Sequence, residues 1–443
     1  MNAYERTLAE LYALEAATGI DLKLDRVRRA LAVLGSPERR FSAIHIAGTN
    51  GKGSTAAMLD AVLRRSGYRV GLYTSPHLVD FTERIRIDGR MVAEEEVVMR
   101  VAALRAHLDQ VGIALTFFEL VTVLAFDVFA RHDVEIAVLE VGLGGRLDAT
   151  NVVQPLVTAV TGIGLDHEEY LGRTVAAIAR EKAGIMKPGV PTVIGPVSAE
   201  VAELLLQHAA TVGAPADLVG RDVRIEDGAD AFDVVTRHRR WRDLQLGLAG
   251  RFQRGNAAIA IAALERLASA YPVPPEAVRE GLAGVYWPGR LDRIRSEPLL
   301  VLDGAHNLAG ITMLRAEMEV LRAGRPVRLV FGAMQDKNWQ GMWEALRPMV
   351  TSVVVTRPNL PRALAPGLLA AHVGGTMPVR AVDAPADAIA VALGEASADE
   401  VVLVTGSLFL VGAVYAGLLE RWGRRHLFDP WRASASDVRH APA

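Results

Sequence analysis

Short apolar segments alternate with amphipathic helical segments along most of this 443-residue chain, and this alternation constrains the fold more than any other feature. Parallel strands need crossover connections, which are usually helices. The alternation therefore predicts an α/β protein with a doubly wound, mostly parallel sheet. In the first part of the chain we expect strands at 41–47, 68–73, 134–141 and 156–163, and helices at 4–17, 24–34, 53–66, 94–111, 117–131 and 174–183.

A second series of strands and helices begins near residue 298 and predicts a second, Rossmann-like α/β domain. A chain of this length exceeds the usual single core. We assign an N-terminal domain to 1–290, a C-terminal domain to 298–443 and a proline-containing linker to 291–297, with a small β-rich excursion at 215–246. The strands of the second series are expected at 299–302, 327–331, 352–356, 379–382 and 401–405.

The composition excludes several classes of function. Cysteine is absent, so disulfides, thiolate nucleophiles and thiolate metal sites are excluded. The net charge of −2 gives no basis for non-specific nucleic-acid binding. The first residues carry charges throughout, unlike a signal peptide, and no apolar run is long enough to span a bilayer. We therefore expect a cytoplasmic protein that binds neither nucleic acid nor membrane.

Lysine is rare in this chain, with five lysines among 49 basic residues. Arginine serves wherever a generic positive charge is sufficient. The lysines are therefore candidates for chemistry that a guanidinium cannot perform, namely a compact charge on a phosphate or an amine that can lose its proton. The alternative is a drift toward arginine that left lysines at random. The five are Lys23, Lys52, Lys182, Lys187 and Lys337.

The glycine-rich segment GTNGKGST (48–55) follows the first predicted strand of the sheet and opens a helix. Glycines let backbone N–H groups approach phosphate oxygens, and the helix N-terminus adds a favourable dipole. Lys52 is expected to reach the β- and γ-phosphates, and Ser54 and Thr55 are expected to cap the helix. The match to the general P-loop pattern is imperfect because Ile46 replaces its first glycine. The segment predicts nucleotide binding, with a structural tight turn as the alternative.

Acidic and histidine side chains follow two later strands at the point where each strand ends. Glu140 ends the strand 134–141, and Asp166 and His167 follow the next strand. Ligands bind at the carboxyl ends of strands in open α/β sheets, and a carboxylate there suits Mg²⁺. The alternatives are a glutamate that caps its loop and a histidine with a structural role.

Eleven motifs occur in a fixed order from about residue 4 to 425, and together they resemble the folylpolyglutamate synthases. Many bacterial members of this folate branch of the Mur-ligase superfamily are also dihydrofolate synthases. The motifs are GTNGKGST, YTSPHL (73–78), ERIRIDG (83–89), TFFE (116–119), EVGLGGRLDATN (140–151), LDHEEYLG (165–172), EKAGI (181–185), WPGR (287–290), DGAHN (303–307), GAMQDKNW (332–339) and VTGS (404–407).

The resemblance implies a Mur-ligase-like fold and an ATP-dependent amide ligase. Such an enzyme phosphorylates a folate carboxylate to an acyl phosphate, which the amino group of L-glutamate attacks, so that ADP and phosphate are released. The acceptor is tetrahydrofolate, with dihydropteroate as a second acceptor in bifunctional members. The implied cofactors are ATP and Mg²⁺ at two sites, with room for a monovalent cation, and we expect a monomer.

The resemblance also assigns roles to residues. Lys52, Lys182 and His167 are implied in catalysis, with Lys182 matching the family's carbamylated lysine; a solvated helix lysine is the alternative. ATP binding is implied for Thr49, Asn50, Gly51, Lys52, Gly53, Ser54, Asn256, Arg290, Asp303 and His306, and magnesium binding for Ser75, Glu140 and His167. Folate binding is implied for Ile20, Asp21, Leu22, Thr116, Phe117, Phe118, Glu119, Leu147, Asp148 and Ala149, and core packing is the alternative for the two phenylalanines.

Two competing interpretations follow from the same motifs. A ligase acting on UDP-muramyl precursors usually carries an extra N-terminal domain, whereas this P-loop begins at residue 48. A P-loop switch protein does not need the second α/β domain or the EKAGI lysine. We expect the catalytic site in a cleft between the two domains. The residues leave open whether the enzyme is monofunctional, which folate form it prefers and how long its polyglutamate products are.

Overall fold

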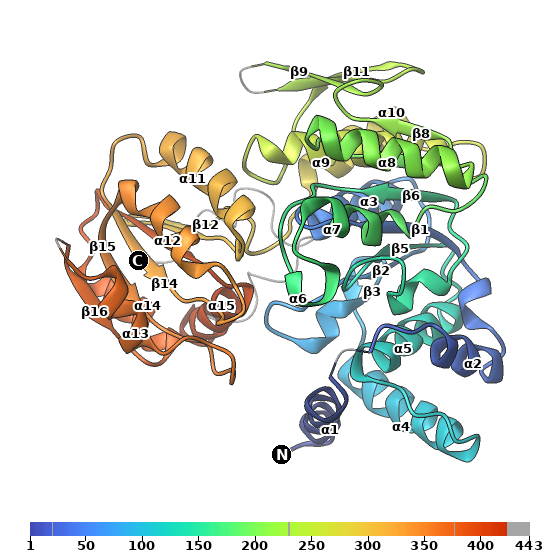
Figure 1. Ribbon diagram of the computed structural model, residues 1–443, viewed down its shortest axis with the longest axis horizontal. Helices are drawn as coiled ribbons and strands as arrows, with labels where there is room; N and C mark the ends of the chain where they lie inside the picture. Colours follow the sequence, from blue (N-terminus) through green and yellow to red (C-terminus); the bar gives the residue numbers. More distant parts are fainter. Residues whose placement is uncertain (20, 229–230, 376, 423–443) are drawn as a thin grey trace. The chain divides into compact units, whose positions relative to one another are not determined.

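The computed structural model describes residues 1–19, 21–228, 231–375 and 377–422. Packing divides the chain into two compact units (Figure 1). The first unit comprises Met1–Gly164, Glu168–Gly247 and Gln253–Val285. The second unit comprises the chain from Tyr286 onward together with two short segments, Leu165–His167 and Leu248–Phe252.

The first unit contains a large, mostly parallel sheet and a small antiparallel one. Its strands are β1 (Ser42–Ala47), β2 (Val70–Tyr73), β3 (Ile85–Ile87), β4 (Arg90–Met91), β5 (Ile136–Glu140), β6 (Val157–Val160), β7 (Thr192–Ile194), β8 (Ala216–Leu218), β9 (Arg224–Asp227), β10 (Phe232–Val235) and β11 (Arg240–Leu244). The large sheet has the order β4-β3-β2-β5-β1-β6-β7-β8, and the small sheet has the order β11-β10-β9. In the large sheet only the pairs β2–β3 and β3–β4 are antiparallel.

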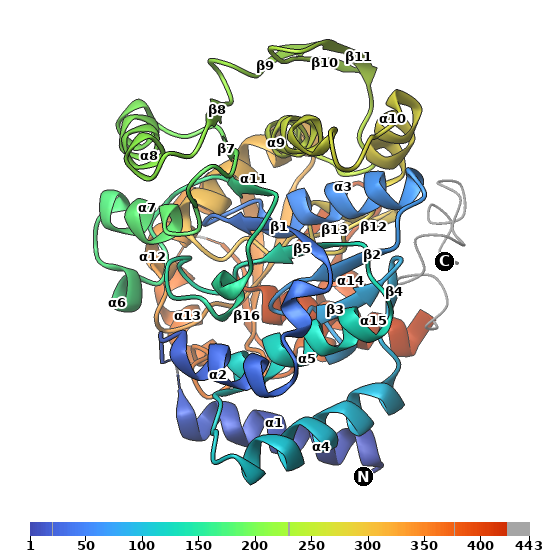
Figure 2. The ribbon, with the colours of Figure 1, turned by 90° about the vertical axis from the view of Figure 1, so that its right-hand side faces the viewer.

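Helices cover both faces of the large sheet. They are α1 (Ala3–Thr18), α2 (Asp25–Val33), α3 (Lys52–Arg65), α4 (Glu94–Gln110), α5 (Phe117–Arg131), α6 (Glu168–Leu171), α7 (Val175–Ala183), α8 (Ala199–Val212), α9 (Phe252–Leu267) and α10 (Pro275–Gly284), with the 3₁₀ turns η1 (Pro37–Arg39), η2 (Phe81–Arg84) and η3 (Ala149–Val152). Figure 2 shows α3 and α10 on one face of the sheet and α1, α2, α4 and α5 on the other.

The most deeply buried helix of the first unit is α5, and its sequence explains why. Apolar residues surround it on all sides, which is typical of a helix packed between layers rather than on a surface. Phe126 and Phe129 pack with sheet residues such as Ala43 and Leu139 in one core. The central strand β5 is buried at every position, as expected for a strand covered on both faces.

The second unit contains one six-stranded sheet. Its strands are β12 (Asp292–Ser296), β13 (Leu299–Leu302), β14 (Val327–Phe331), β15 (Val350–Val355), β16 (Val379–Ala381) and β17 (Val401–Thr405), in the order β12-β13-β17-β14-β15-β16. Only β12 is antiparallel to its neighbour. The helices are α11 (Leu308–Arg322), α12 (Trp339–Leu346), α13 (Pro366–Val373), α14 (Pro385–Glu395) and α15 (Leu408–Trp422), with the 3₁₀ turn η4 (Arg347–Met349).

The α/β fold predicted from the alternation is confirmed, with shifts of one or two residues at most boundaries. One assignment differs. Residues 292–296, which the sequence placed in a linker, form strand β12 and pair with β13. The charged residues at 293 and 295 hid an edge strand in which Asp292 and Ile294 are buried. Among the described residues, no helix combines the length and the apolar character that crossing a bilayer requires.

A glycine in α10 sets its distance from α3, the helix that opens at Lys52. A Cβ added at Gly281 would lie 2.7 Å from both Cα and Cγ2 of Val62, whereas a Cβ at Gly284, in the same helix, would meet no atom within 4 Å. The Cα atom of Val62 belongs to the backbone of α3, so it could move away from an added Cβ only if one of the two helices moved.

We expect Gly281→Ala to lower the free energy of unfolding by about 1–3 kcal/mol, because overpacking forces α10 away from α3. The matched variant Gly284→Ala should leave it unchanged or raise it by up to about 1 kcal/mol, since alanine favours a helix over glycine. Urea unfolding of both variants measures the difference. Equal stabilities would contradict the close contact.

Candidate functional site

The turn between β1 and α3 has the form of a phosphate cradle. Gly51 is the N-cap of α3 and has a φ of 92°, a left-handed conformation that favours glycine. A Cβ at Gly51 would lie 2.4 Å from Oδ1 of Asn256, so a larger residue would have to displace this amide. No side chain caps α3, which corrects the expectation that Ser54 and Thr55 do so. The first N–H groups of the helix therefore remain available to an anion.

Hydrogen bonds hold the P-loop to the residues that follow β6. The backbone N–H of Thr49 donates to the carbonyl of Gly162 at 2.7 Å, and its hydroxyl donates to the carbonyl of Gly164 at 3.1 Å. The hydroxyl of Thr161 donates to the carbonyl of Asn50 at 2.8 Å. These hydrogen bonds attach the P-loop to the segment that follows the neighbouring strand β6, and they thereby fix the shape of the loop.

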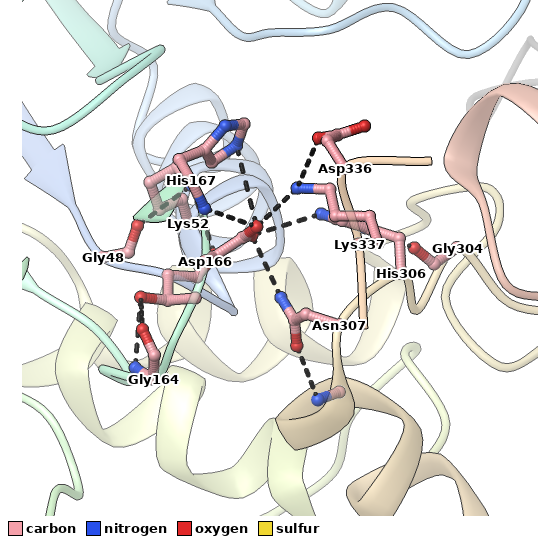
Figure 3. Close-up of polar contacts among 12 residues, drawn as sticks. Gly48, Lys52, Gly164, Asp166, His167, Gly304, His306, Asn307, Asp336 and Lys337 are labelled. Atoms are coloured by element: carbon pink, nitrogen blue, oxygen red, sulfur yellow. Dashed lines mark hydrogen bonds and ion pairs between the residues drawn. The ribbon is translucent and has the colours of Figure 1, made fainter. Parts of the chain in front are cut away.

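Two of the rare lysines meet at one carbonyl of the P-loop. Nζ of Lys52 donates to the carbonyls of Gly48 at 3.0 Å and Thr49 at 3.3 Å (Figure 3). Nζ of Lys182, on α7, donates to the same Gly48 carbonyl at 2.8 Å. Lys182 is 5 % exposed, so its interpretation as a solvated helix lysine is wrong. The sequence motif EKAGI therefore belongs to the P-loop environment.

Helix α9 supplies a polar pair to the same region. Nδ2 of Asn256 donates to Oε1 of Gln253 at 2.8 Å, and Nε2 of Gln253 lies 3.4 Å from Oγ of Ser54. Gln253 is fully buried, and the sequence interpretation gave it no role. Its position one helical turn before Asn256 was the available signal, because residues three apart share a helix face.

The carboxyl ends of the neighbouring strands β2 and β5 bring a carboxylate and a serine close together. Glu140, the last residue of β5, is buried, and its Oε2 accepts a hydrogen bond from the backbone N–H of Ser75 at 3.2 Å. A carboxylate and a nearby hydroxyl fit Mg²⁺, which takes few protein ligands and completes its shell with water and phosphate oxygens. Throughout the described ranges, no three histidine or acidic side chains form a closed metal site.

In the second unit, Asp166 is the centre of a buried polar cluster (Figure 3). Its carboxylate lies 2.5 Å from Nζ of Lys337 and 3.5 Å from Nε2 of His306, and it accepts hydrogen bonds from Nδ2 of Asn307 at 3.1 Å and from the backbone N–H of His167 at 2.9 Å. Burial opposes ionisation, but the hydrogen bond and charge of His306 and the charge of Lys337 hold the pKa of Asp166 well below its usual range. The sequence interpretation placed Asp166 at a strand end and counted Lys337 among the candidate lysines, but it gave neither residue a specific role.

Asp303 shapes the turn after β13. Its oxygens accept hydrogen bonds from the backbone N–H groups of Leu291 at 2.7 Å and Ala305 at 2.9 Å. Burial raises the pKa of Asp303, while Arg290 and these hydrogen bonds oppose the rise. Nη1 of Arg290 donates to the carbonyl of Gly289 at 2.9 Å. Arg290, Asp303 and His306 therefore belong to one turn region of the second unit.

An arginine connects two of the segments implied in folate binding. Nη1 of Arg26 lies 2.8 Å from Oδ2 of Asp21, and Nη2 lies 2.9 Å from Oε1 of Glu119. Glu119 also accepts a hydrogen bond from the backbone N–H of Thr116 at 2.7 Å, as part of the capping box of α5. Ile20, implied in the same role, lies outside the described residues. Arg26 was missed because its two partners are 5 and 93 residues away.

Phe118, near the start of α5, packs against Tyr73 and against Gly142. The ring of Phe118 lies 6.2 Å from that of Tyr73, and a Cβ at Gly142 would come within 2.3 Å of its Cζ. Phe117 is buried, whereas Leu22 and Leu147 are half-buried. The ring of Phe118 therefore covers the glycine-rich loop that follows β5.

Asp148 organises that same loop. Its Oδ2 accepts hydrogen bonds from the backbone N–H groups of Gly142 at 3.0 Å and Leu143 at 2.9 Å, and its Oδ1 bonds to Thr150. The Thr150 hydroxyl lies 2.8 Å from Nε2 of the buried His45 on β1. Burial lowers the pKa of His45 to about 3, so the ring is neutral near neutral pH. Ala149, next in the chain, is also buried.

Models of known protein families match residues of both units. The model of the Mur ligase middle domain matches residues 46–264, and that of the Mur ligase glutamate ligase domain matches residues 289–408. The chain is 37% identical to the folylpolyglutamate synthase of Lacticaseibacillus casei over 408 residues, which span 89% of this chain and 94% of the relative.

Two solved structures show the same likeness. Escherichia coli FolC in complex with DHPP and ADP has a TM-score of 0.87 and 33% identity, covering 94% of this chain and 98% of its own. The bifunctional folylpolyglutamate synthase/dihydrofolate synthase from Yersinia pestis, complexed with AMPPNP and Mn ion, has a TM-score of 0.84 and 34% identity, covering 93% and 98%. The resemblance predicted from the motifs is thereby confirmed, and the chain belongs to the folylpolyglutamate synthase/dihydrofolate synthase family of Mur ligases.

Proposed function

We propose that this chain is an ATP-dependent ligase that joins L-glutamate to a carboxylate of a folate and releases ADP and phosphate. The observation that carries the proposal is the P-loop carbonyl of Gly48, which is bound by Lys52 and by the buried Lys182. A glutamate ligase domain and relatives that bind adenine nucleotides support the same activity.

The residues of the P-loop have separate tasks in this proposal. The N–H groups at the start of α3 bind the phosphates of ATP, with Asn256 beside Gly51 on the opposite side of the loop. Lys52 leaves the carbonyls it now contacts and binds the phosphoryl group that is transferred. ATP with Mg²⁺ supplies that group and neutralises its charge. Because phosphoryl transfer needs positioning and positive charge, no protein nucleophile is required.

We propose that Ser75, Glu140 and His167 bind magnesium and that Arg290, Asp303 and His306 bind the nucleotide. The hard oxygen donors at the ends of β2 and β5 support the metal assignment. A second magnesium, a monovalent cation, a monomeric state, a cytoplasmic location and a catalytic cleft between the domains 1–290 and 298–443 stay predictions.

For the acceptor, we propose that segments 20–22, 116–119 and 147–149 bind a folate or dihydropteroate. Arg26 supports this assignment because it links the first two segments, and Asp148 does so because it holds the loop under Phe118. Flat heterocycles stack on aromatic rings, which makes Phe117 and Phe118 suitable neighbours.

The proposed reaction is tested by offering each acceptor separately. We expect the purified protein to release phosphate from ATP only when glutamate and either tetrahydrofolate or dihydropteroate are both present. Phosphate release together with mass spectrometry of the product measures this. Turnover with dihydropteroate identifies a bifunctional enzyme, and turnover of ATP without any acceptor would contradict the ligase assignment.

Lys52→Ala should reduce kcat to less than a tenth of its original value while the fold is kept, because the variant loses the compact cation beside the transferred phosphoryl group. Arg65→Ala is the matched control. It also removes a cation from α3, but at the other end of the helix, about 20 Å away. Steady-state kinetics and urea unfolding of both variants are compared. Similar kcat values in the two variants would remove Lys52 from catalysis.

We propose that Lys182 is carbamylated. Only a neutral amine attacks CO₂, forming an N–C bond with loss of a proton, and burial favours the neutral form of an amine. The product is an anion on a long stem beside the P-loop. An arginine cannot react in this way.

Lys182→Arg should therefore be nearly inactive although the positive charge is kept, and Lys182→Ala should regain activity when acetate is added. Lys187→Arg, five residues later in the chain, is the control and should keep most of its activity. Kinetics with and without acetate, and ¹³C NMR in labelled bicarbonate, provide the readouts. Normal activity of Lys182→Arg would exclude a carbamate.

A further inference from the structure

One buried arginine of the first unit forms no ion pair with any carboxylate in the part of the chain that the structure describes. Arg84 is 7 % exposed, and its Nε donates to Nδ1 of His77 at 2.8 Å. Within the described ranges, its guanidinium forms no ion pair, and the charges of Glu15 and Glu83 act on it from beyond ion-pair distance. Buried charges in proteins are normally paired, because an unpaired one loses its hydration without compensation.

Aromatic rings enclose this guanidinium instead of acidic groups. Its Cζ lies 5.4 Å from the ring centroid of Phe117 and 5.9 Å from that of Phe81. The ring of Tyr12, which is 38 % exposed, lies 6.0 Å from Phe117 and 6.5 Å from His77. The rings stabilise the cation but do not neutralise it.

His77 orients the guanidinium without supplying negative charge. A guanidinium nitrogen can only donate a hydrogen bond, so Nδ1 of His77 accepts the bond from Nε of Arg84. One edge of the guanidinium is used in this way, and its two terminal nitrogens keep their capacity for a bidentate carboxylate.

Arg84 contacts two segments of the proposed active site. Its side chain packs on Phe117, in the segment proposed for the folate ring system. Its backbone carbonyl accepts a hydrogen bond from the N–H of Thr74 at 3.1 Å, one residue before Ser75, which we propose as a magnesium ligand. The carboxylate end of an acceptor must point from the first segment toward the second.

We propose that Arg84 binds a carboxylate of the acceptor substrate, with the benzoyl ring of that substrate beside Phe117 and Tyr12. This inference rests on the proposed folate ligase activity and adds a residue to its acceptor site. Two carboxylates have the required chemistry. One is the single carboxylate of dihydropteroate, and the other is the α-carboxylate of a glutamyl residue already attached to folate.

A double-mutant cycle between protein and ligand tests the proposal. The variant is Arg84→Gln, which keeps a polar side chain but removes the charge. The ligands are two matched pairs, tetrahydrofolate with its α-carboxamide and dihydropteroate with its carboxamide. Binding is measured by calorimetry on the full chain in the presence of a non-hydrolysable ATP analogue and Mg²⁺.

We expect the original protein to bind at least one carboxylate ligand about tenfold or more tightly than its carboxamide, as for a charge-assisted hydrogen bond of about 1.5–3 kcal/mol. Arg84→Gln should bind both members of that pair almost equally. Loss of discrimination in the tetrahydrofolate pair identifies the α-carboxylate, and loss in the dihydropteroate pair identifies the benzoate carboxylate. Unchanged discrimination in both pairs would overturn the proposal.

Arg86 provides the matched control because it is a second buried arginine of the same motif. It is 6 % exposed, the charges of Glu83 and Asp60 act on it, and its Nε donates to the backbone carbonyl of Glu83 at 3.4 Å. Arg86→Gln should lower stability but keep the carboxylate preference. If Arg84→Gln does not fold, Arg84→Lys replaces it and should keep only part of the preference, because an ammonium cannot bind bidentately.

Failure of the Arg84 assignment can be distinguished from failure of the proposed ligase activity. If the original protein does not ligate glutamate to either acceptor, the ligase assignment fails. If ligation proceeds and Arg84→Gln still discriminates carboxylate from carboxamide as before, only the assignment of Arg84 fails.

Discussion

The close contact between the P-loop and its neighbours is the constraint on which the rest of the first unit depends. The loop can approach phosphate only if its backbone is exposed and held still. Gly51 meets this requirement beside Asn256, where a Cβ would overlap the amide. Thr49 fixes the loop to the residues after β6, and Lys182 fixes the carbonyl of Gly48 from α7. Three elements therefore converge on one short turn, and the strands beneath them determine where it lies.

The sheet order explains why chemically important side chains gather at the middle of the first unit. Strands β2, β5, β1 and β6 are adjacent and parallel, so their carboxyl ends meet at one edge. The P-loop and Ser75 follow the ends of β1 and β2, and Glu140 is the last residue of β5. The chain runs from β1 to β2 on one side of β1, and from β5 to β6 on its other side, which is the arrangement in which α/β proteins bind ligands.

Several polar side chains that we propose for the site bind backbone N–H groups of the protein itself. Asp148 holds the N–H groups of the glycine-rich loop, Asp303 holds the turn after β13, and Glu119 closes the capping box of α5. A carboxylate that is already bound in this way positions its segment before a substrate arrives, which reduces the ordering that binding would otherwise require. Rigid loops of this kind are what a ligase needs to hold three substrates in register.

The sequence by itself determined the strand and helix periods, the α/β class, the P-loop and the importance of Lys52 and Lys182, because these depend on local pattern and composition. Only the tertiary structure decided that Lys182 reaches Gly48, that Asp166 pairs with Lys337, and that Arg84 lies among aromatic rings. These pairs are separated by many residues, and hydrophobic periodicity carries no information on which distant side chains meet. Strand β12 was missed for a related reason, since its charged positions become compatible with a strand only when β13 lies beside it.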